Sequence, residues 1–298
     1  MKEKLKLALK DKDFSELLRG SSLAFFLRFG GLMAGYLLTL IIANLFGADG
    51  LGDYVLSITV LRLFTLLSKL GLDTTSIKFI ASFASQNKWT SISKFRNKVV
   101  FILIISSITF SLLLYVLSQP IADLINTQVK YIKLNSFFIL PMSFFMLHYQ
   151  SLRGLKRIAE FSFFYRMSQS LFTVVSVLII YYFIQDNEVP IYAYLVSLLL
   201  VSALAFLSFI YNLNKKSYGK ESAEMQILKY SQILKISIPL MFAQSVQFIM
   251  AWTDKLMLGS MTTTIDVGVY HTAFKLSMFA AVALMSVNSI ASPKFAEM

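Results

Sequence analysis

The stretch ANLFGADGLGDYVLSITVLRLFTLLSKLGLDTTSIKFIASF, residues 43–83, decides how this chain is interpreted. It begins with a glycine-rich turn that contains Asp49 and Asp53. An apolar segment follows that encloses Arg62, and the stretch ends where a basic loop begins. A charged side chain inside an apolar segment of this length needs a structural or functional reason.

A weaker copy of this pattern, MLGSMTTTIDVGVYHTAFKLSMFAAVALMSVNSIASP, occupies residues 257–293. An offset of 216 residues brings Gly268 to the position of Gly52. Lys275 then lies near the position of Arg62, within one helical turn of strict register. The repetition indicates a structure built twice around charges that lie inside a membrane.

The composition is typical of a membrane protein. Of the 298 residues 56% are hydrophobic and only 15% are charged, and the mean hydropathy is +0.66. Soluble domains are about 45–50% apolar and about 25% charged. The net charge of +12 comes from lysines and arginines in short loops between apolar runs, which favours membrane topology over nucleic-acid binding. The absence of cysteine excludes disulfides and thiol chemistry.

The apolar runs predict an all-α, polytopic membrane protein with eight transmembrane helices, because a spanning helix needs about 20 mostly apolar residues. The segments have helical lengths and lack the alternation of a β-barrel. The predicted spans are 21–46, 54–70, 99–117, 134–152, 161–183, 191–211, 236–258 and 267–291.

Basic residues in the loops predict the orientation of these spans. On one side of the membrane lie 21 Lys and Arg residues, and on the other only Lys130 and Lys133. Because cytoplasmic loops carry an excess of basic residues, both termini are expected in the cytoplasm.

Three basic residues lie deep in predicted spans, namely Arg28, Arg62 and Lys275. No acidic residue lies deep in any predicted span to neutralise them. They are therefore expected to face a water-filled cavity that binds an anion, and phosphate is the natural partner of arginine. The alternative is structural, with these side chains pairing with helix carbonyls or reaching the membrane surface.

The other charged residues in the spans have simpler interpretations. Arg166 lies close enough to the inner surface to extend its side chain into water. Asp254 and Lys255 lie near the outer surface, where a local ion pair or solvation explains them, although a role in coupling or gating stays open.

Three helix-modifying residues are candidates for gating. Gly31 and Gly35 form a small-xxx-small pair in the first span, which favours close helix packing but also permits a bend. Pro141 lies well inside the fourth span and is expected to kink it.

The sequence contains no nucleotide-binding glycine loop, no metal-binding triplet and no nucleophile elbow. An enzyme is therefore not predicted, and neither a catalytic residue, a metal site nor a cofactor is expected.

Several words of the sequence carry a resemblance to a known family. They are LFGADGLGDY (45–54), LGLDTTSIKFIA (70–81), LRGLKR (152–157), and ISIPLMFAQSVQFIMAWTDKLMLG…VGVYHTAFKLSMF…SP (236–293). With the repeat spacing, they make the chain similar to the polysaccharide flippase branch of the multidrug/oligosaccharidyl-lipid/polysaccharide exporter superfamily, which is MATE-like.

The resemblance implies two six-helix lobes that rock around a central cavity in the bacterial inner membrane. It implies a flippase that moves polyprenyl-diphosphate-linked oligosaccharide to the outer leaflet for O-antigen (lipopolysaccharide), capsule or exopolysaccharide, alongside a polymerase and other assembly proteins. Related flippases for lipid-linked peptidoglycan precursors hold the diphosphate with arginines in the first, second and eighth helices. Arg28, Arg62 and Lys275 correspond to them by helix and depth, not by exact alignment.

The resemblance also implies the division of the chain, with a basic cytoplasmic N-terminus (1–20), a first six-helix lobe (21–212), a cytoplasmic linker (213–235) and two helices of a second lobe (236–298). The family has twelve to fourteen helices, so a chain truncated after eight is expected. Two alternatives stay open. A cation-coupled multidrug exporter needs buried carboxylates, of which only Asp254 is available. A non-transporting membrane subunit is the other.

Overall fold

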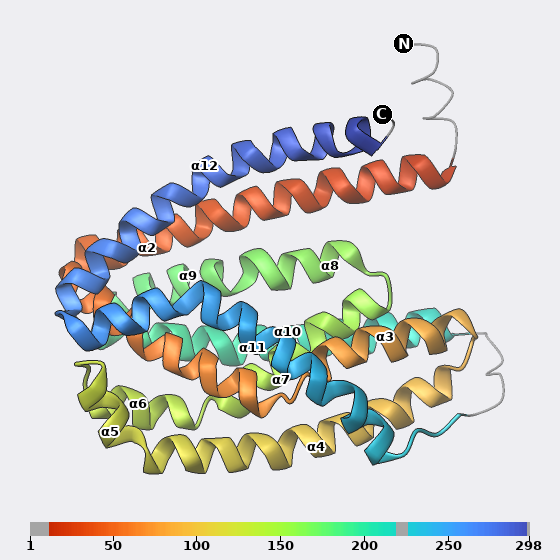
Figure 1. Ribbon diagram of the computed structural model, residues 1–298, viewed down its shortest axis with the longest axis horizontal. Helices are drawn as coiled ribbons and strands as arrows, with labels where there is room; N and C mark the ends of the chain where they lie inside the picture. Colours follow the sequence, from red (N-terminus) through yellow and green to blue (C-terminus); the bar gives the residue numbers. More distant parts are fainter. Residues whose placement is uncertain (1–11, 219–225, 297–298) are drawn as a thin grey trace.

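The computed structural model describes residues 12–218 and 226–296, with side chains described for 26–218 and 226–280. Every element in these ranges is helical, as predicted, and residues 1–11 of the expected N-terminal segment lie outside them. The elements are α2 (Lys12–Ser68), α3 (Leu72–Ser85), α4 (Trp89–Val116), α5 (Ser118–Leu124), α6 (Val129–Ser136), α7 (Ile139–Gly154), α8 (Ile158–Phe163), the π-helical turn η1 (Phe164–Ser168), α9 (Gln169–Phe183), α10 (Val189–Ser217), α11 (Tyr230–Met261) and α12 (Thr264–Ala296) (Figure 1).

Within the described residues, five helical segments are long and apolar enough to cross a membrane. They are Phe26–Ser68, Trp89–Val116, Ile158–Phe183, Val189–Ser217 and Tyr230–Met261. The chain is thus a helical membrane protein, while the predicted number of eight spans is met only in part. Phe26–Ser68 holds the first two predicted spans in one helix interrupted by a kink.

The kink in α2 lies at Gly47, whose φ of 73° and ψ of −179° suit only glycine. The first half of α2 runs to this residue and the second half runs back, as the red and orange ribbons show (Figure 1). The helix resumes directly after Gly47, so it begins several residues before the predicted second span, 54–70. We call the end of the bundle at this turn the Gly47 end, and the opposite end the termini end.

The predicted fourth span, 134–152, is divided between α6 and α7. Phe138 is the N-cap of α7, so Pro141 lies in the first turn of a new helix instead of kinking a continuous one. Its missing N–H costs no hydrogen bond there, because the first N–H groups of a helix have no partner inside it. The Pro141 carbonyl accepts a hydrogen bond of 3.2 Å from Ser202 Oγ on α10.

The predicted fifth span, 161–183, contains the π-helical turn η1, which the sequence did not indicate. This turn brings the backbone of Arg166 against the first half of α2. A Cβ on Gly31 would lie only 2.5 Å from the Arg166 carbonyl oxygen, so glycine permits this close packing.

Helices α11 and α12 pack against different halves of α2. The long helix α12 runs beside the first half of α2 (Figure 1), and Tyr36 meets Phe279 edge-to-face at 5.4 Å. Helix α11 packs against the second half of α2 and against α3. Here, a Cβ on Gly71 would lie 2.2 Å from the carbonyl oxygen of Ser237.

The two repeated segments meet at the Gly47 end through reciprocal backbone contacts. A Cβ on Gly52 would lie 1.9 Å from the Thr264 carbonyl oxygen, and a Cβ on Gly268 would lie 2.1 Å from that of Ala48. Beside them, Asn126 Nδ2 donates to the carbonyl oxygen of Gly259 at 3.0 Å. We call these contacts the seam.

The outward faces of the helices are apolar. Large side chains such as those of Leu112 on α4, Ile179 on α9, Leu207 on α10 and Met250 on α11 are more than half exposed. Inside the bundle, residues such as Leu61 are fully buried. Apolar side chains on both faces of a helix are typical of a protein surrounded by lipid.

A cationic cavity as the candidate functional site

A cavity of about 400 Å³ lies between the first half of α2, the η1–α9 segment, α11 and α12. Its size lies within the range of roughly 300–1,000 Å³ that is usual for ligand pockets. None of the described residues that line it is Asp or Glu. Its basic residues are Arg28, Arg62, Arg166, Lys255 and Lys275. We call it the cationic cavity.

Arg62, on the second half of α2, lines this cavity. Its guanidinium carbon lies 4.9 Å from the centre of the Trp252 ring, a cation–π contact between α2 and α11. The buried Nε has no hydrogen-bond partner, and within residues 26–218 and 226–280 no carboxylate pairs with Arg62. Donor capacity on Arg62 therefore remains for a ligand.

Lys255 is the most enclosed of the five basic residues. Its side chain is 2% exposed, and Nζ lies 4.1 Å from the Phe274 ring centre and 5.0 Å from that of Trp252. It forms a 3.3 Å ion pair with Asp254, which also accepts a 2.7 Å hydrogen bond from Tyr270. The local ion pair, one of the two explanations that the sequence offered for these residues, is present. Asp254 does not line the cavity.

Lys275 and Arg28 are two further basic residues that line the cavity. A Cβ on Gly35 would lie 3.4 Å from Lys275 Nζ, so the ammonium group rests over the glycine backbone of α2. Neither Lys275 nor Arg28 forms an ion pair with any described residue. His271, one turn before Lys275, is buried and its Nδ1 has no partner in the same part of the chain.

Arg166 belongs to this cavity, although the sequence favoured a side chain extended to the membrane surface. Its guanidinium carbon lies 4.5 Å from the centre of the Tyr165 ring, and both residues are among those that line the cavity. The π-helical turn η1 holds both residues. Such turns occur frequently at functional sites.

Polar groups without charge form the wall on α9 and α10. Gln169 Nε2 donates to Ser197 Oγ at 2.9 Å, and the hydroxyl groups of Thr173 and Ser197 lie 2.8 Å apart. Tyr194 is fully buried and its ring meets that of Tyr54 at 5.9 Å. Gln169, Thr173 and Tyr194 of this group line the cavity, so α9 and α10 contribute hydrogen-bonding groups to its wall.

Residues 17–298 match the sequence model of a family described as polysaccharide biosynthesis protein. The chain belongs to this family. The basic cavity described above is therefore a feature of a polysaccharide biosynthesis protein, and the family agrees with the resemblance found in the sequence.

Two solved structures have a similar fold. One, described as protein A, shares 15% identity with a TM-score of 0.57. The other is the MATE multidrug transporter DinF-BH, with 12% identity and a TM-score of 0.55. Each comparison covers 89% of this chain and 62% of the solved chain, so this chain spans less than two thirds of either protein. No protein with a curated description matches the chain.

The structure brings Arg28, Arg62 and Lys275 to one cavity, together with Gly31 and Gly35. Pro141 does not line it. The aromatic residues Trp252 and Tyr165 also line it, and neither was predicted from the sequence. Trp252 could have been found from its position three residues before Lys255, because residues at this spacing share a helix face.

Lys69 and Asp73 were not singled out from the sequence as candidate site residues. They form a buried ion pair of 2.6 Å, with side chains 9% and 2% exposed. Their spacing of four residues across Leu70 and Gly71 was the available signal.

Proposed function

We propose that this polysaccharide biosynthesis protein acts in a flippase that moves polyprenyl-diphosphate-linked oligosaccharide from the cytoplasmic to the outer leaflet. The product would serve surface polysaccharide such as O-antigen, capsule or exopolysaccharide. Family membership supports the polysaccharide pathway. The fold, similar to that of a MATE transporter, supports transport across a membrane.

The observation that carries this proposal is the unpaired charge of the cationic cavity. Arg28, Arg62, Arg166 and Lys275 have no carboxylate partner among the described residues, and no described lining residue is acidic. Each charge placed deep in a membrane costs roughly 2.5–3.5 kcal/mol even on the lenient scale. An anionic ligand offsets this cost, and a diphosphate suits the forked donors of arginine.

The proposed orientation follows the distribution of basic residues, with the termini end in the cytoplasm of a bacterial cell and the Gly47 end outside. In this orientation the seam would lie at the outer end of the protein and join the two repeated segments there. Alternating access would then separate the seam contacts of Gly52 and Gly268 while the lobes rock around the cationic cavity. The two-lobe division and assembly partners such as a polymerase remain part of the proposal.

A cation-coupled multidrug exporter is the second candidate, favoured by the similarity to a multidrug transporter fold. Its mechanism requires an available carboxylate in the cavity. Asp254 is occupied by Lys255 and Tyr270, and the five basic residues of the cationic cavity repel an organic cation. The flippase is therefore the better-supported function.

The test is genetic rescue. In a bacterial strain that lacks its own flippase, the gene for this protein with matching assembly genes should restore surface polysaccharide. Arg62→Gln and Lys275→Gln should abolish rescue, whereas Lys133→Gln, an exchange at the Gly47 end outside the cavity, should not. Rescue by both cavity variants at the wild-type level would overturn the diphosphate assignment. If the wild-type gene gives resistance to cationic drugs and does not restore surface polysaccharide, the exporter is favoured.

A further inference from the structure

A second cavity of about 560 Å³ adjoins the cationic cavity on the side of the termini end. It lies between the second half of α2, α3, α7 and α11, and it shares Arg62, Tyr165 and Trp252 with the cationic cavity. Its polar lining includes Lys69, Asp73, Tyr149, Gln150, Gln244 and Gln247.

The chemistry of the second cavity differs from that of the first. Aromatic rings line it together with side-chain amides and the hydroxyl of Thr74. Ring faces favour C–H surfaces, while amides offer both donors and acceptors. A pyranose presents these same two features, C–H faces and hydroxyl groups that both donate and accept.

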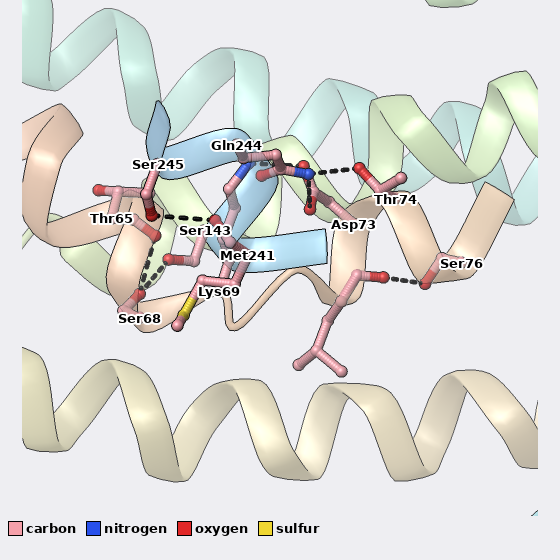
Figure 2. A network of polar contacts seen from close by, with 11 residues as sticks. Thr65, Ser68, Lys69, Asp73, Thr74, Ser76, Ser143, Met241, Gln244 and Ser245 are labelled. Carbon is pink, nitrogen blue, oxygen red and sulfur yellow. Dashed lines mark hydrogen bonds and ion pairs between the residues drawn. The ribbon is translucent and has the colours of Figure 1, made fainter. Parts of the chain in front are cut away.

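The polar wall of this cavity is already ordered. Figure 2 shows Gln244 on α11 reaching Thr74 and Asp73 on α3, and Asp73 also accepts the 2.6 Å hydrogen bond from Lys69. These contacts hold the Gln244 amide in one orientation. Its Oε1, like that of Gln150, is buried and has no hydrogen-bond partner among the described residues. Buried polar atoms are normally paired, so the two oxygens call for an explanation.

We propose that the second cavity binds the sugar that directly follows the diphosphate of the lipid-linked substrate. Trp252 and Tyr165, at the junction of the two cavities, provide aromatic surface beside the cations that cover their ring faces, and the amides of Gln150, Gln244 and Gln247 bind hydroxyl groups. This inference rests on the proposed function, because Arg62 borders both cavities and would bind the diphosphate between them.

The lining disfavours other occupants. An organic cation would meet Arg62, Lys69 and Arg153 with a single carboxylate, Asp73, which is already paired. A lipid chain would leave the amides without partners, which is costly in an apolar site. A sugar offers C–H groups that contact the aromatic rings and hydroxyl groups that form hydrogen bonds with the amides.

The test compares two ligands on the purified chain in lipid nanodiscs. Undecaprenyl diphosphate probes the cationic cavity alone, and undecaprenyl diphosphate that carries one N-acetylhexosamine, in a panel of stereoisomers, probes both. Gln247→Ala is the informative variant, because Gln247 is exposed and has no hydrogen-bond partner among the described residues, so that folding does not depend on it. Gln119→Ala, at the Gly47 end, is the matched control.

We expect Gln247→Ala to weaken the best-bound sugar-bearing ligand about three- to tenfold, and the sugar-free ligand less than about twofold. Lys275→Gln should weaken both ligands by the same factor. Equal effects of Gln247→Ala on both ligands, or none on either, would overturn the sugar site while the Lys275 result still supports the proposed function. Failure of the wild type to bind either ligand would overturn both.

A second readout uses Trp252, because the chain has only two tryptophans and Trp89 lies outside both cavities. In a Trp89→Phe background, the sugar-bearing ligand should shift Trp252 fluorescence beyond the shift caused by undecaprenyl diphosphate. Identical shifts with every sugar of the panel and with the sugar-free ligand would contradict contact between the sugar and Trp252.

Discussion

Gly52 and Gly268, which are 216 residues apart, each pack against the backbone of the residue four positions before the other. Gly52 meets Thr264 and Gly268 meets Ala48. A contact in which equivalent residues exchange the same partners is the mark of a two-fold relation between two segments. The weak sequence repeat thus has a counterpart in space, at the seam of the Gly47 end.

Replacing Gly268 with alanine should open this seam. The added Cβ would lie 2.1 Å from the Ala48 carbonyl oxygen, and a backbone atom cannot move aside as a flexible side chain can. We expect a loss of about 1–3 kcal/mol in the free energy of unfolding, as for other overpacked contacts. Gly30→Ala is the control, because its Cβ would meet only the mobile end of Met167 at 3.2 Å.

The measurement uses cysteine crosslinking, since the chain contains no cysteine. Thr264 Oγ1 donates a hydrogen bond to Asp49, so Asp49→Cys with Thr264→Cys should crosslink readily with a short bifunctional reagent. Gly268→Ala should reduce the yield and Gly30→Ala should not. Unchanged crosslinking and stability in Gly268→Ala would show that the seam is not tightly packed.

Lys275→Met should stabilise the unliganded protein. The ammonium group lies among other basic residues without an acidic partner in the described part of the chain, so an apolar side chain of similar shape removes repulsion and desolvation cost. We expect a gain of about 1–2 kcal/mol, seen as a higher unfolding temperature in detergent. A clear loss of stability would mean that Lys275 has a structural role.

Gly31 and Gly35 should respond differently to alanine. At Gly31 the Cβ would collide with the Arg166 backbone at 2.5 Å, which should cost about 1–3 kcal/mol of stability. At Gly35 the nearest atom is Lys275 Nζ at 3.4 Å, so the fold should tolerate the change. Thermal unfolding checks this difference, and equal destabilisation by both variants would contradict it.

The ion pair of Lys130 with Glu188 should make stability depend on pH. Hydrogen bonds from Lys130 and Tyr192 lower the pKa of Glu188 below its ordinary value of 4.5. Ionised Glu188 therefore contributes stability above about pH 4.5, which is lost as the pH falls through its lowered pKa. Because Lys130 is half exposed, the contribution should be only ~0.5 kcal/mol.

The measurement compares the thermal unfolding of wild type and Glu188→Gln at several pH values. At pH 7 the variant should be slightly less stable, and the difference should shrink as the pH falls below 4.5 through the lowered pKa of Glu188. A difference that persists at low pH would indicate that Glu188 acts through packing instead of charge.

The helical membrane fold, the shared location of the buried basic residues and the internal repeat could be predicted from the sequence. Apolar runs and trapped charges follow directly from the cost of polar groups in lipid, so the helical membrane fold and the grouping of Arg28, Arg62 and Lys275 were accessible. The repeat at Gly52 and Gly268 was visible as well. These features depend on residue type and spacing alone.

Features that depend on tertiary packing could not be predicted. The π-helical turn around Arg166 is associated with the close approach of Gly31, which lies more than a hundred residues earlier. Asp73 follows a turn and was not singled out from the sequence, yet α11 covers that turn, and Gln244 donates a hydrogen bond to the carboxylate. Only the packing of α11 on α2 and α3 makes this turn part of a cavity wall.

The central claim is that the cationic cavity binds a diphosphate. Its most direct test measures binding of undecaprenyl diphosphate and of uncharged undecaprenol to the chain in nanodiscs. The wild type should prefer the diphosphate at least about tenfold, and Arg62→Gln combined with Lys275→Gln should reduce this preference to less than about twofold. An undiminished preference in the double variant would contradict the claim.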